Sequence, residues 1–454
     1  MNDGLEKYLE GLLPREMRNR SLSALDSQLS PIRNLFRQRR LPVLGWHDDI
    51  IVFFLKLLSM MDLDKDPEAV RIGEREARVA SPLISELAQG FCHGIGRSGT
   101  LTAPQPKAPG ASVLYEFANL CALDAIQKFG APNMKSAVVS PLSTGMTLAL
   151  ALVEAREESS KEKNTVVYPR IDHDSPMKAV RLTNLQAKVV DGKIIGDAVR
   201  ISADDISKAV DKNCCAILST TTFFPPREPD SIKEIAKIAA ERNVFHIINN
   251  AYGVQSREIM HEIRSAADAG RVDVVVQSTD KNFLAPVGGA IIASPRDGFA
   301  EKAATYYAGR ASAAPVYQFL SAILSLGTEG YEKLRDIQES NRLLLEKRLG
   351  EVAEACNERV LKVRNPVACA MTISKSDTLA LGGILYSLRL SGPRVVLSGQ
   401  TGSCCSNYPN SYIVMNAAIG SKEADIVKAT EKLRQGLSQA SAKKTNRKDH
   451  QEQS

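Results

Sequence analysis

Short apolar runs alternate with longer amphipathic segments between about residues 110 and 300. Each run is short and rich in Val and Ile, which is typical of buried strands. The runs lie at 138–140, 165–168, 215–220, 244–248 and 272–276. Segments with helical spacing separate them, so we expect a mainly parallel central sheet with helices on both faces. In such sheets ligands bind beyond the carboxyl ends of the strands, so the residues after each strand are candidates for a site.

The segment that begins at Ser231 shows how one of these helices is predicted. Ser231 and Glu234 have the spacing of a capping box, in which two side chains bond to the free N–H groups at a helix start. Ile232, Ile235 and Ile238 then fall on one face of the helix.

The flanking regions follow other patterns and suggest the domain organisation. Residues 1–70 look helical, with a buried helix around 50–58, and we expect an N-terminal helical extension there. A large domain should then span 71–320. A smaller α/β domain should span 321–440, after a long helix broken at Gly327 and Gly330. The polar residues 441–454 have no apolar pattern and are expected to form a disordered tail.

Composition narrows the class of protein. The chain has 454 residues, of which 44% are hydrophobic and 24% charged, as in ordinary soluble proteins. It has no apolar run of about 18 residues, and its N-terminus lacks the order of a signal peptide, so we expect a cytoplasmic protein that does not enter a membrane. The eight cysteines form no CxxC motif and the six histidines form no zinc motif. We therefore expect reduced thiols and no metal site.

The net charge of +6 is unevenly placed. Residues 15–40 hold seven arginines against only Glu16 and Asp26. Such a segment would attract a nucleic acid through its positive field. A solvated helix face or a contact between subunits would explain the same charges.

Lys281 lies between two apolar runs, 272–276 and 290–293. A lysine that is partly removed from water is a good nucleophile and can form an imine with an aldehyde cofactor. A surface lysine at the tip of a hairpin is the other interpretation of these residues.

Three other strand ends carry polar residues that suit a phosphorylated cofactor. Ser143-Thr144-Gly145 opens a helix, where free N–H groups and hydroxyls could bind a phosphate. His173 follows the second run. The segment 249–253 resembles the Asp-x-Ala-His/Tyr-Gly motif of fold-type I pyridoxal-phosphate enzymes, with Asn249 in place of the aspartate that pairs with the pyridine nitrogen. An uncharged partner makes the cofactor a weaker electron sink, which favours a reaction with a good β-leaving group over transamination.

Two glycine-arginine segments indicate a second phosphate. One is Gly96-Arg97-Ser98-Gly99, followed by Gln105; the other contains Gly309-Arg310. Backbone N–H groups and a guanidinium together bind phosphate bidentately. Two such segments exceed what one cofactor phosphate needs, so we expect a phosphorylated substrate.

Six longer motifs occur in an order that identifies a family. They are GEREARV (73–79), GFCHGIGRSG (90–99), QPKA (105–108), NNAYGVQ (249–255), DKNFLAPVGGAIIA (280–293) and GRASAAP (309–315). Together they resemble the O-phosphoseryl-tRNA(Sec):selenocysteinyl-tRNA synthase family, and its archaeal members more than its animal ones. The resemblance covers roughly residues 5 to 435.

The resemblance implies an α/β enzyme of fold type I, similar to aspartate aminotransferase, that depends on pyridoxal 5'-phosphate. It implies conversion of O-phosphoseryl-tRNA(Sec) to selenocysteinyl-tRNA(Sec) by elimination of phosphate and addition of selenium from selenophosphate. The implied assembly is a homotetramer, a dimer of dimers. The N-terminal region 1–70 would help to build it and would contact the selenocysteine tRNA.

Roles for single residues follow from their motif positions. Lys281 would be the Schiff-base lysine and the catalytic base. The resemblance assigns Arg97, Ser98, Gln105 and Arg310 to the substrate phosphate. It assigns Arg75 to the cofactor, across a dimer interface, and gives Glu74 the role of repelling a free α-carboxylate, which an aminoacyl ester lacks.

The resemblance is incomplete in one segment. Residues 399–405 are shorter than in animal members, and no arginine there matches the one that reads the tRNA acceptor end. Two other functions stay open at this point. One is a pyridoxal-phosphate enzyme acting on a free amino acid, similar to a cysteine desulfurase, and the other is a non-catalytic tRNA-binding protein.

Overall fold

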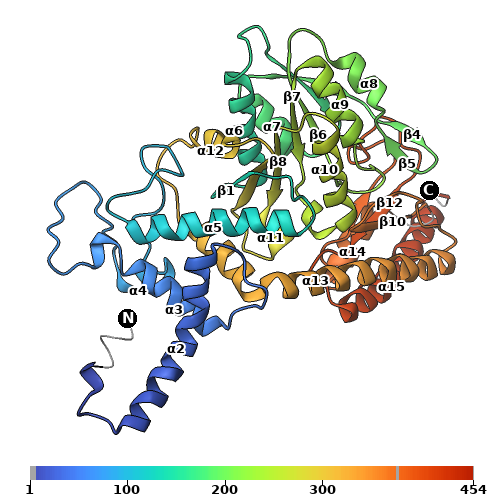
Figure 1. Cartoon of the computed structure of the whole chain (residues 1–454). Helices are drawn as coiled ribbons and strands as arrows, with labels where there is room; N and C mark the ends of the chain where they lie inside the picture. The colour runs from blue at the N-terminus through green and yellow to red at the C-terminus, as the bar shows by residue number, and fades with distance from the viewer. Residues whose placement is uncertain (1–6, 375–377, 453–454) are drawn as a thin grey trace.

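The computed structural model describes residues 7–374 and 378–452, and its large domain is built on a seven-stranded sheet (Figure 1). The strands are β1 (Ser136–Ser140), β2 (Thr165–Pro169), β3 (Gln186–Val190), β6 (Cys214–Thr220), β7 (Phe245–Asn249), β8 (Val274–Ser278) and β9 (Ala290–Ser294). Their order is β1-β9-β8-β7-β6-β2-β3. The strands from β3 to β8 pair in parallel, and β9 runs antiparallel to both β8 and β1. The expected mainly parallel sheet is confirmed.

Helices cover both faces of this sheet because its strands send alternate side chains to two separate cores. In β2, Val166 and Tyr168 belong to the main core, whereas Val167 belongs to a second core with residues of α9 (Ile232–Arg242). The helix α6 (Thr144–Glu157) packs against β6 to β9 and is apolar nearly all round because it is buried there. The other helices of the large domain are α5 (Pro109–Lys128), α7 (Asp174–Leu182), α8 (Ala203–Ala209), α10 (Arg257–Ala269) and α12 (Phe299–Ala304).

The N-terminal region forms helices that lie partly outside the main body (Figure 1). These are α2 (Arg15–Gln38), α3 (Asp48–Ser59), the short η1 (Leu63–Lys65) and α4 (Pro82–Leu87). Aromatic side chains hold α2 and α3 to α5: the ring centroids of Phe36 and Phe117 are 4.8 Å apart, and those of Phe54 and Phe117 are 6.1 Å apart. The far half of α2 projects away from these contacts, so most of the arginines of 15–40 lie on an exposed helix.

The C-terminal region forms a second small layer behind a long helix. The helix α13 (Ala314–Ala355) bends at Gly327, whose φ of +60° suits glycine and whose missing side chain lets the carbonyl oxygen of Val43 approach. Three antiparallel strands follow, in the order β10-β12-β11: β10 (Ala368–Thr372), β12 (Tyr412–Asn416) and β11 (Arg394–Val396). The helices α14 (Thr378–Ser387) and α15 (Glu423–Glu452) cover them around a core of their own.

Three local expectations need correction. Ser231 is the N-cap of α9 but its side chain makes no capping hydrogen bond, so the predicted capping box does not form. The long helix breaks at Gly327 and not at Gly330, where the backbone stays helical. Residues 441–452 continue α15 where we expected a tail without structure, because adding turns to an anchored helix needs no new nucleation. Residues 453–454 lie outside the described part.

Within the described ranges no helix is both long and apolar enough to span a bilayer. The same residues contain no group of three or more metal-binding side chains.

Candidate active site

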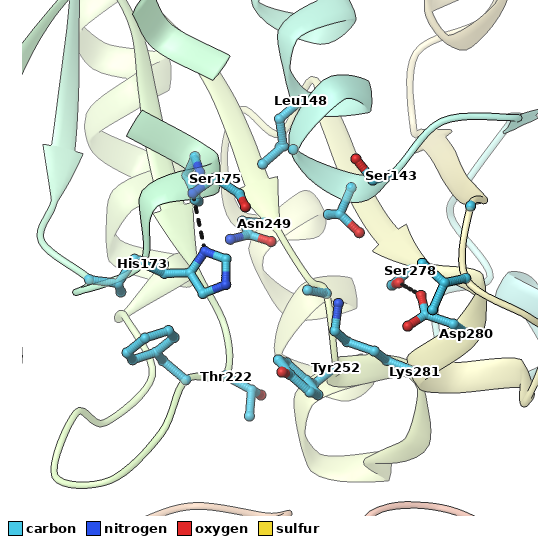
Figure 2. Close-up of a pocket in the computed structure, with 18 residues that line it drawn as sticks. Ser143, Leu148, His173, Ser175, Thr222, Asn249, Tyr252, Ser278, Asp280 and Lys281 are labelled. Atoms are coloured by element: carbon cyan, nitrogen blue, oxygen red, sulfur yellow. Dashed lines mark hydrogen bonds between the residues drawn. The ribbon is translucent and has the colours of Figure 1, made fainter. Parts of the chain in front are cut away.

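Polar side chains from five strand ends meet in a cavity at the carboxyl edge of the sheet, which we call the lysine cavity (Figure 2). The strands β1, β2, β6, β7 and β8 all deliver residues to it. The predicted residues that line it are Ser143, Thr144, Gly145, His173, Asn249 and Lys281. Because parallel strands end at one edge, residues as far apart in the sequence as Ser143 and Lys281 come together there.

Lys281 lies on α11 (Thr279–Phe283), a short helix between β8 and β9, and its amine points into the lysine cavity (Figure 2). Asn282 fixes this helix: its side-chain nitrogen donates to the carbonyl oxygens of Ala251 (2.9 Å) and Ser278 (2.8 Å). The Lys281 Nζ lies 5.3 Å from the centroid of the Tyr252 ring. It forms no ion pair with any described residue, so its position is set by backbone anchoring and by an aromatic face.

His173 lies at the opposite side of the lysine cavity from Lys281 (Figure 2). Its Nδ1 accepts a hydrogen bond from the backbone N–H of Ser175 at 3.2 Å, so the neutral ring carries its proton on Nε2. Partial burial lowers the pKa of His173, and the charges of Lys281 and Arg394 act in the same direction. The ring is therefore neutral near pH 7 and can lie against a flat ligand.

The start of α6 offers hydrogen-bond donors to the lysine cavity. Ser143 is its N-cap, but the Ser143 side chain does not cap the helix. The first N–H groups of α6 are thus available to an anion. Gly145 permits the close approach of α7, since a Cβ there would lie 3.0 Å from the Cβ of Ser175. The buried hydroxyl groups of Thr144 and Thr222 have no hydrogen-bond partner among the described residues.

Asn249 ends β7, and its side-chain oxygen is buried without a hydrogen-bond partner in the described part of the chain. The neighbouring Asn250 differs, since its oxygen accepts a hydrogen bond of 2.7 Å from the Thr221 hydroxyl. A buried polar atom without a partner is unusual in a folded protein. Asn249 therefore faces the lysine cavity, which it lines, whereas Asn250 is bonded to the protein.

Sequence reasoning missed Arg394, which reaches this region from β11 of the small domain. Its guanidinium lies 5.3 Å from the centroid of the Phe224 ring. Its charge adds to the effect of burial in lowering the pKa of His173, and it opposes the effect of burial, which raises the pKa of Tyr252. No motif around Arg394 in the sequence indicates that it lies beside the lysine cavity. Asp172 explains the placement, because it accepts hydrogen bonds from the backbone N–H groups of Gly402 (2.7 Å) and Cys404 (2.9 Å) and so docks the 399–405 segment beside His173.

A second cavity, which we call the arginine cavity, contains the other predicted residues except Glu74. Arg75, Arg97, Ser98, Gln105 and Arg310 all line it. Ile95 and Ala311 form a two-bond antiparallel bridge (2.9 and 3.3 Å) that brings the two glycine-arginine segments together. In the described part of the chain, Arg75, Arg97 and Arg310 have no ion-pair partner. The cavity therefore presents unpaired positive charge.

The loop that carries Arg97 is a tight turn that only certain residues can form. Arg97 and Thr100 exchange two backbone hydrogen bonds, of 3.0 and 2.9 Å. Ser98 and Gly99 between them both have positive φ, 52° and 88°, which is the geometry of a type I′ turn. The Gln105 side chain donates to the Gly96 carbonyl oxygen at 3.4 Å and supports the turn from below.

The loop 71–78 positions Arg75 in a similar way. Arg71 donates to the carbonyl oxygen of Glu76 (2.9 Å) and Arg78 to that of Gly73 (2.9 Å). Glu76, which sequence reasoning also missed, is buried and bonds to Lys107, and this contact holds the pKa of Glu76 below its usual value. Glu74 and Arg75 consequently point outward. Arg75 lines the arginine cavity and Glu74 lines neither cavity.

Within one chain the two cavities have no lining residue in common. From the sequence we expected these residues to form one site, but within one chain they line two separate cavities. Lys281 with the strand-end residues is in one cavity, and the arginines with Ser98 and Gln105 are in the other.

Solved structures with the same architecture define the class. Sphingosine-1-phosphate lyase from Burkholderia pseudomallei superposes with a TM-score of 0.58 at 16% identity, covering 97% of this chain and 94% of that one. Oryza sativa TDC, solved with PLP and tryptamine, superposes with a TM-score of 0.60 at 12% identity, covering 94% of this chain and 99% of that one. At such identities the likeness concerns the fold alone, which is that of the fold-type I pyridoxal-phosphate enzymes.

Closer relatives show the family. The family model described as O-phosphoseryl-tRNA(Sec) selenium transferase matches residues 61–438. Transferases of that name from Methanopyrus kandleri and Methanococcus maripaludis are 44% and 41% identical, each covering 94% of this chain and 99% of the relative. The one from Dictyostelium discoideum is 34% identical, over 87% of this chain and 91% of that protein. The crystal structure of an archaeal O-phosphoseryl-tRNA(Sec) selenium transferase gives a TM-score of 0.90 at 41% identity, covering 94% and 98%. The chain belongs to the O-phosphoseryl-tRNA(Sec) selenium transferase family, and the stronger resemblance to archaeal members is confirmed.

Proposed function

We propose that this chain converts O-phosphoseryl-tRNA(Sec) to selenocysteinyl-tRNA(Sec) with pyridoxal phosphate as cofactor and selenophosphate as selenium donor. The observation that carries the proposal is the arginine cavity. There the Ile95–Ala311 bridge brings the segments of Arg97 and Arg310 together, and neither arginine has a carboxylate partner among residues 7–374 and 378–452. A fold-type I enzyme for a free, unphosphorylated amino acid needs no such cavity. The family membership gives the phosphorylated substrate its identity.

The residues of the lysine cavity fit pyridoxal phosphate. The free N–H groups at the start of α6, with Ser143, Thr144 and Gly145, suit its phosphate. The amide of Asn249 suits a ring nitrogen, to which its N–H group can donate. The neutral His173 suits the ring face, and the amine of Lys281 suits the aldehyde. When bound, the group supplies the electron withdrawal that makes the substrate Cα acidic.

This chain's residues then have separate tasks in the proposed reaction. Lys281 takes the proton from the substrate Cα and later returns one. Arg97, Ser98, Gln105 and Arg310 bind the phosphate of the substrate and stabilise its charge as it leaves. Asn249 is uncharged and would not keep the ring nitrogen of the cofactor protonated. The cofactor would then withdraw less electron density than it would beside an aspartate, and a reaction with a good leaving group tolerates this.

Arg75 and Glu74 also have roles in the proposed function. Arg75 lines the arginine cavity and contacts the cofactor of a neighbouring subunit. The outward-facing Glu74 repels a free α-carboxylate, which phosphoserine has and its tRNA ester lacks. Discrimination against free phosphoserine follows from this charge.

We also propose that a second copy of the chain completes each site, within a homotetramer. Separation of the two cavities in one chain supports this, because elimination needs Lys281 and the phosphate-binding arginines at one substrate. Apolar side chains are exposed beside both cavities: Val287 is 81% exposed near Lys281 and Ile72 is 91% exposed near Arg75. Such surfaces are typical of subunit contacts. The arginines of α2 would contact the tRNA, and the enzyme would act in the cytoplasm.

The test is to incubate the purified protein with phosphoseryl-tRNA(Sec) and selenophosphate and to identify the aminoacyl group released from the tRNA. We expect selenocysteine, together with stoichiometric inorganic phosphate. Turnover of free phosphoserine or free cysteine at a comparable rate would instead favour an enzyme of free amino acids. Binding of tRNA without cofactor absorption would favour a non-catalytic tRNA-binding protein.

A further inference from the structure

His93 has no role in the function proposed above. It belongs to the 90–99 segment and lines a hollow together with Arg75 and Arg310, which also line the arginine cavity. The residue is only 2% exposed. Neither nitrogen of its ring has a hydrogen-bond partner among the described residues.

His246 shows what a structural histidine looks like in the same protein. It is completely buried in β7, and its Nε2 lies 2.8 Å from the hydroxyl oxygen of Ser219. Its Nδ1 lies 3.2 Å from the carbonyl oxygen of Arg271. Both nitrogens of His246 are thus satisfied, as is usual for buried polar groups. His93 is equally buried and lacks both bonds, so packing alone does not account for it.

Charged groups from four segments surround His93. Asp64 on η1 pairs with Lys65 through one oxygen, and its other oxygen lies 4.0 Å from the Nε2 of His93, with no hydrogen-bond partner among the described residues. Glu76 and Lys107 come from the loops before α4 and α5, and Arg310 from the loop before α13. Burial lowers the pKa of His93, Arg310 and Lys107 act in the same direction, and Asp64 and Glu76 oppose it. The imidazole is neutral at pH 7 and sensitive to any new charge near Arg310.

The proposed elimination needs a proton at its phosphate end. When the bond between the substrate Cβ and the ester oxygen breaks, the electron pair leaves with the phosphate. A dianionic phosphoryl group would then depart as a trianion unless an oxygen takes up a proton. The Cα proton goes to Lys281 in the other cavity, so a second proton holder beside the arginines is required for fast departure.

We propose that His93, backed by Asp64, holds the proton that the leaving phosphate takes up. This inference rests on the proposed function. A bound phosphoryl dianion adds negative charge beside Arg310 and so favours the imidazolium form of His93. As the Cβ–O bond breaks, this proton passes to a phosphate oxygen, hydrogen phosphate leaves, and the neutral ring takes a new proton from solvent. His93 is the proton donor in this step, acting through the hollow that it shares with Arg310, and Asp64 stabilises its charged form.

The test is the pH dependence of single-turnover phosphate release from phosphoseryl-tRNA(Sec) by the cofactor-loaded enzyme. The wild-type rate should fall as the pH rises through the pKa of His93 in the complex, because only the imidazolium carries the proton. His93→Gln should lower the rate by about 100-fold, as loss of a general acid does, and should remove this alkaline limb. Asp64→Asn removes an anion that favours the imidazolium, so it should shift the limb to lower pH.

Two controls separate this role from a structural one. His246→Gln should lower the melting temperature and leave the alkaline limb unchanged. The cofactor absorption at Lys281 should persist in His93→Gln. An unchanged rate and limb in His93→Gln would overturn the inference, and should that variant not fold, an unshifted limb in Asp64→Asn would do the same. A wild-type enzyme that releases no phosphate would refute the proposed function itself, which is a different outcome.

Discussion

The lysine cavity and the arginine cavity are built by different means. The first is formed by the ends of buried strands, and its residues are held by the sheet and by bonds such as those of Asn282. The second is formed by loops in which Ser98, Gly99 and Gly309 adopt positive φ, joined by a single bridge. Among the described residues, the lysine cavity has a fixed frame and buried oxygens without hydrogen-bond partners, whereas the arginine cavity has guanidinium groups without ion-pair partners.

The difference fits a division of labour between cofactor and substrate. A cofactor that stays bound through many turnovers needs a rigid site whose donors match it in advance. A phosphate that arrives and leaves in each turnover is better served by charged loops at the surface. Three predictions test this division, beginning with the largest effect.

Lys281→Ala should abolish turnover and the near-visible absorption of the bound cofactor. The reason is that the amine both holds the cofactor and moves the Cα proton, so its loss removes two functions at once. Absorption spectra and single-turnover assays of phosphate release measure the two effects separately. Measurable activity in this variant would mean that another amine serves the reaction and that the lysine cavity is not the cofactor site.

Arg310→Ala should lower the rate of phosphate release by about 10²–10³-fold, the usual cost of removing one charge-stabilising donor. Cofactor absorption should stay at the wild-type level, because Arg310 does not line the lysine cavity. Arg257→Ala is a suitable control, since this arginine pairs with Glu332, Asp336 and Glu339 on the surface and should leave the rate unchanged. Loss of cofactor in Arg310→Ala would assign the arginine cavity to the cofactor instead.

Mixing two inactive variants tests whether the cavities of different subunits cooperate. If each site takes Lys281 from one subunit and Arg310 from its partner, co-expressed Lys281→Ala and Arg310→Ala chains should form some dimers with one intact site. Random pairing then restores about a quarter of the wild-type activity, because half of the dimers are mixed and each has one complete site. If both residues act within one chain, the mixture should be no more active than the two variants measured alone.

Much of the frame could be predicted from local patterns. The strands at 136–140, 165–169 and 245–249 follow from runs of apolar residues. The start of α6 after Ser143 follows from the Ser-Thr-Gly turn that comes after the first of these runs. The lysine cavity was predictable because parallel strands bring their carboxyl ends to one edge whatever the loops do. Their positions at or after strand ends made Lys281, His173 and Asn249 candidates, although a surface position for Lys281 was the other interpretation of the same residues.

Other parts of the site depend on contacts between distant segments, which no local pattern encodes. Arg394 reaches Phe224 only because Asp172 docks the 399–405 segment on the large domain. His93 could be read as part of a motif, but its missing hydrogen bonds and its 4.0 Å distance to Asp64 appear only in the folded chain.

The sequence by itself determined the class of chemistry: a lysine and an asparagine at strand ends, and two arginine segments for a phosphate. These features can be recognised from residue type and spacing within a few residues of the chain, so no knowledge of the packing is needed. The tertiary structure alone decided that the lysine and the arginines line separate cavities and that a buried imidazole lines a hollow together with two of the arginines. Those facts depend on how loops 71–78, 94–105 and 305–312 pack against one another, and packing is a property of the whole chain.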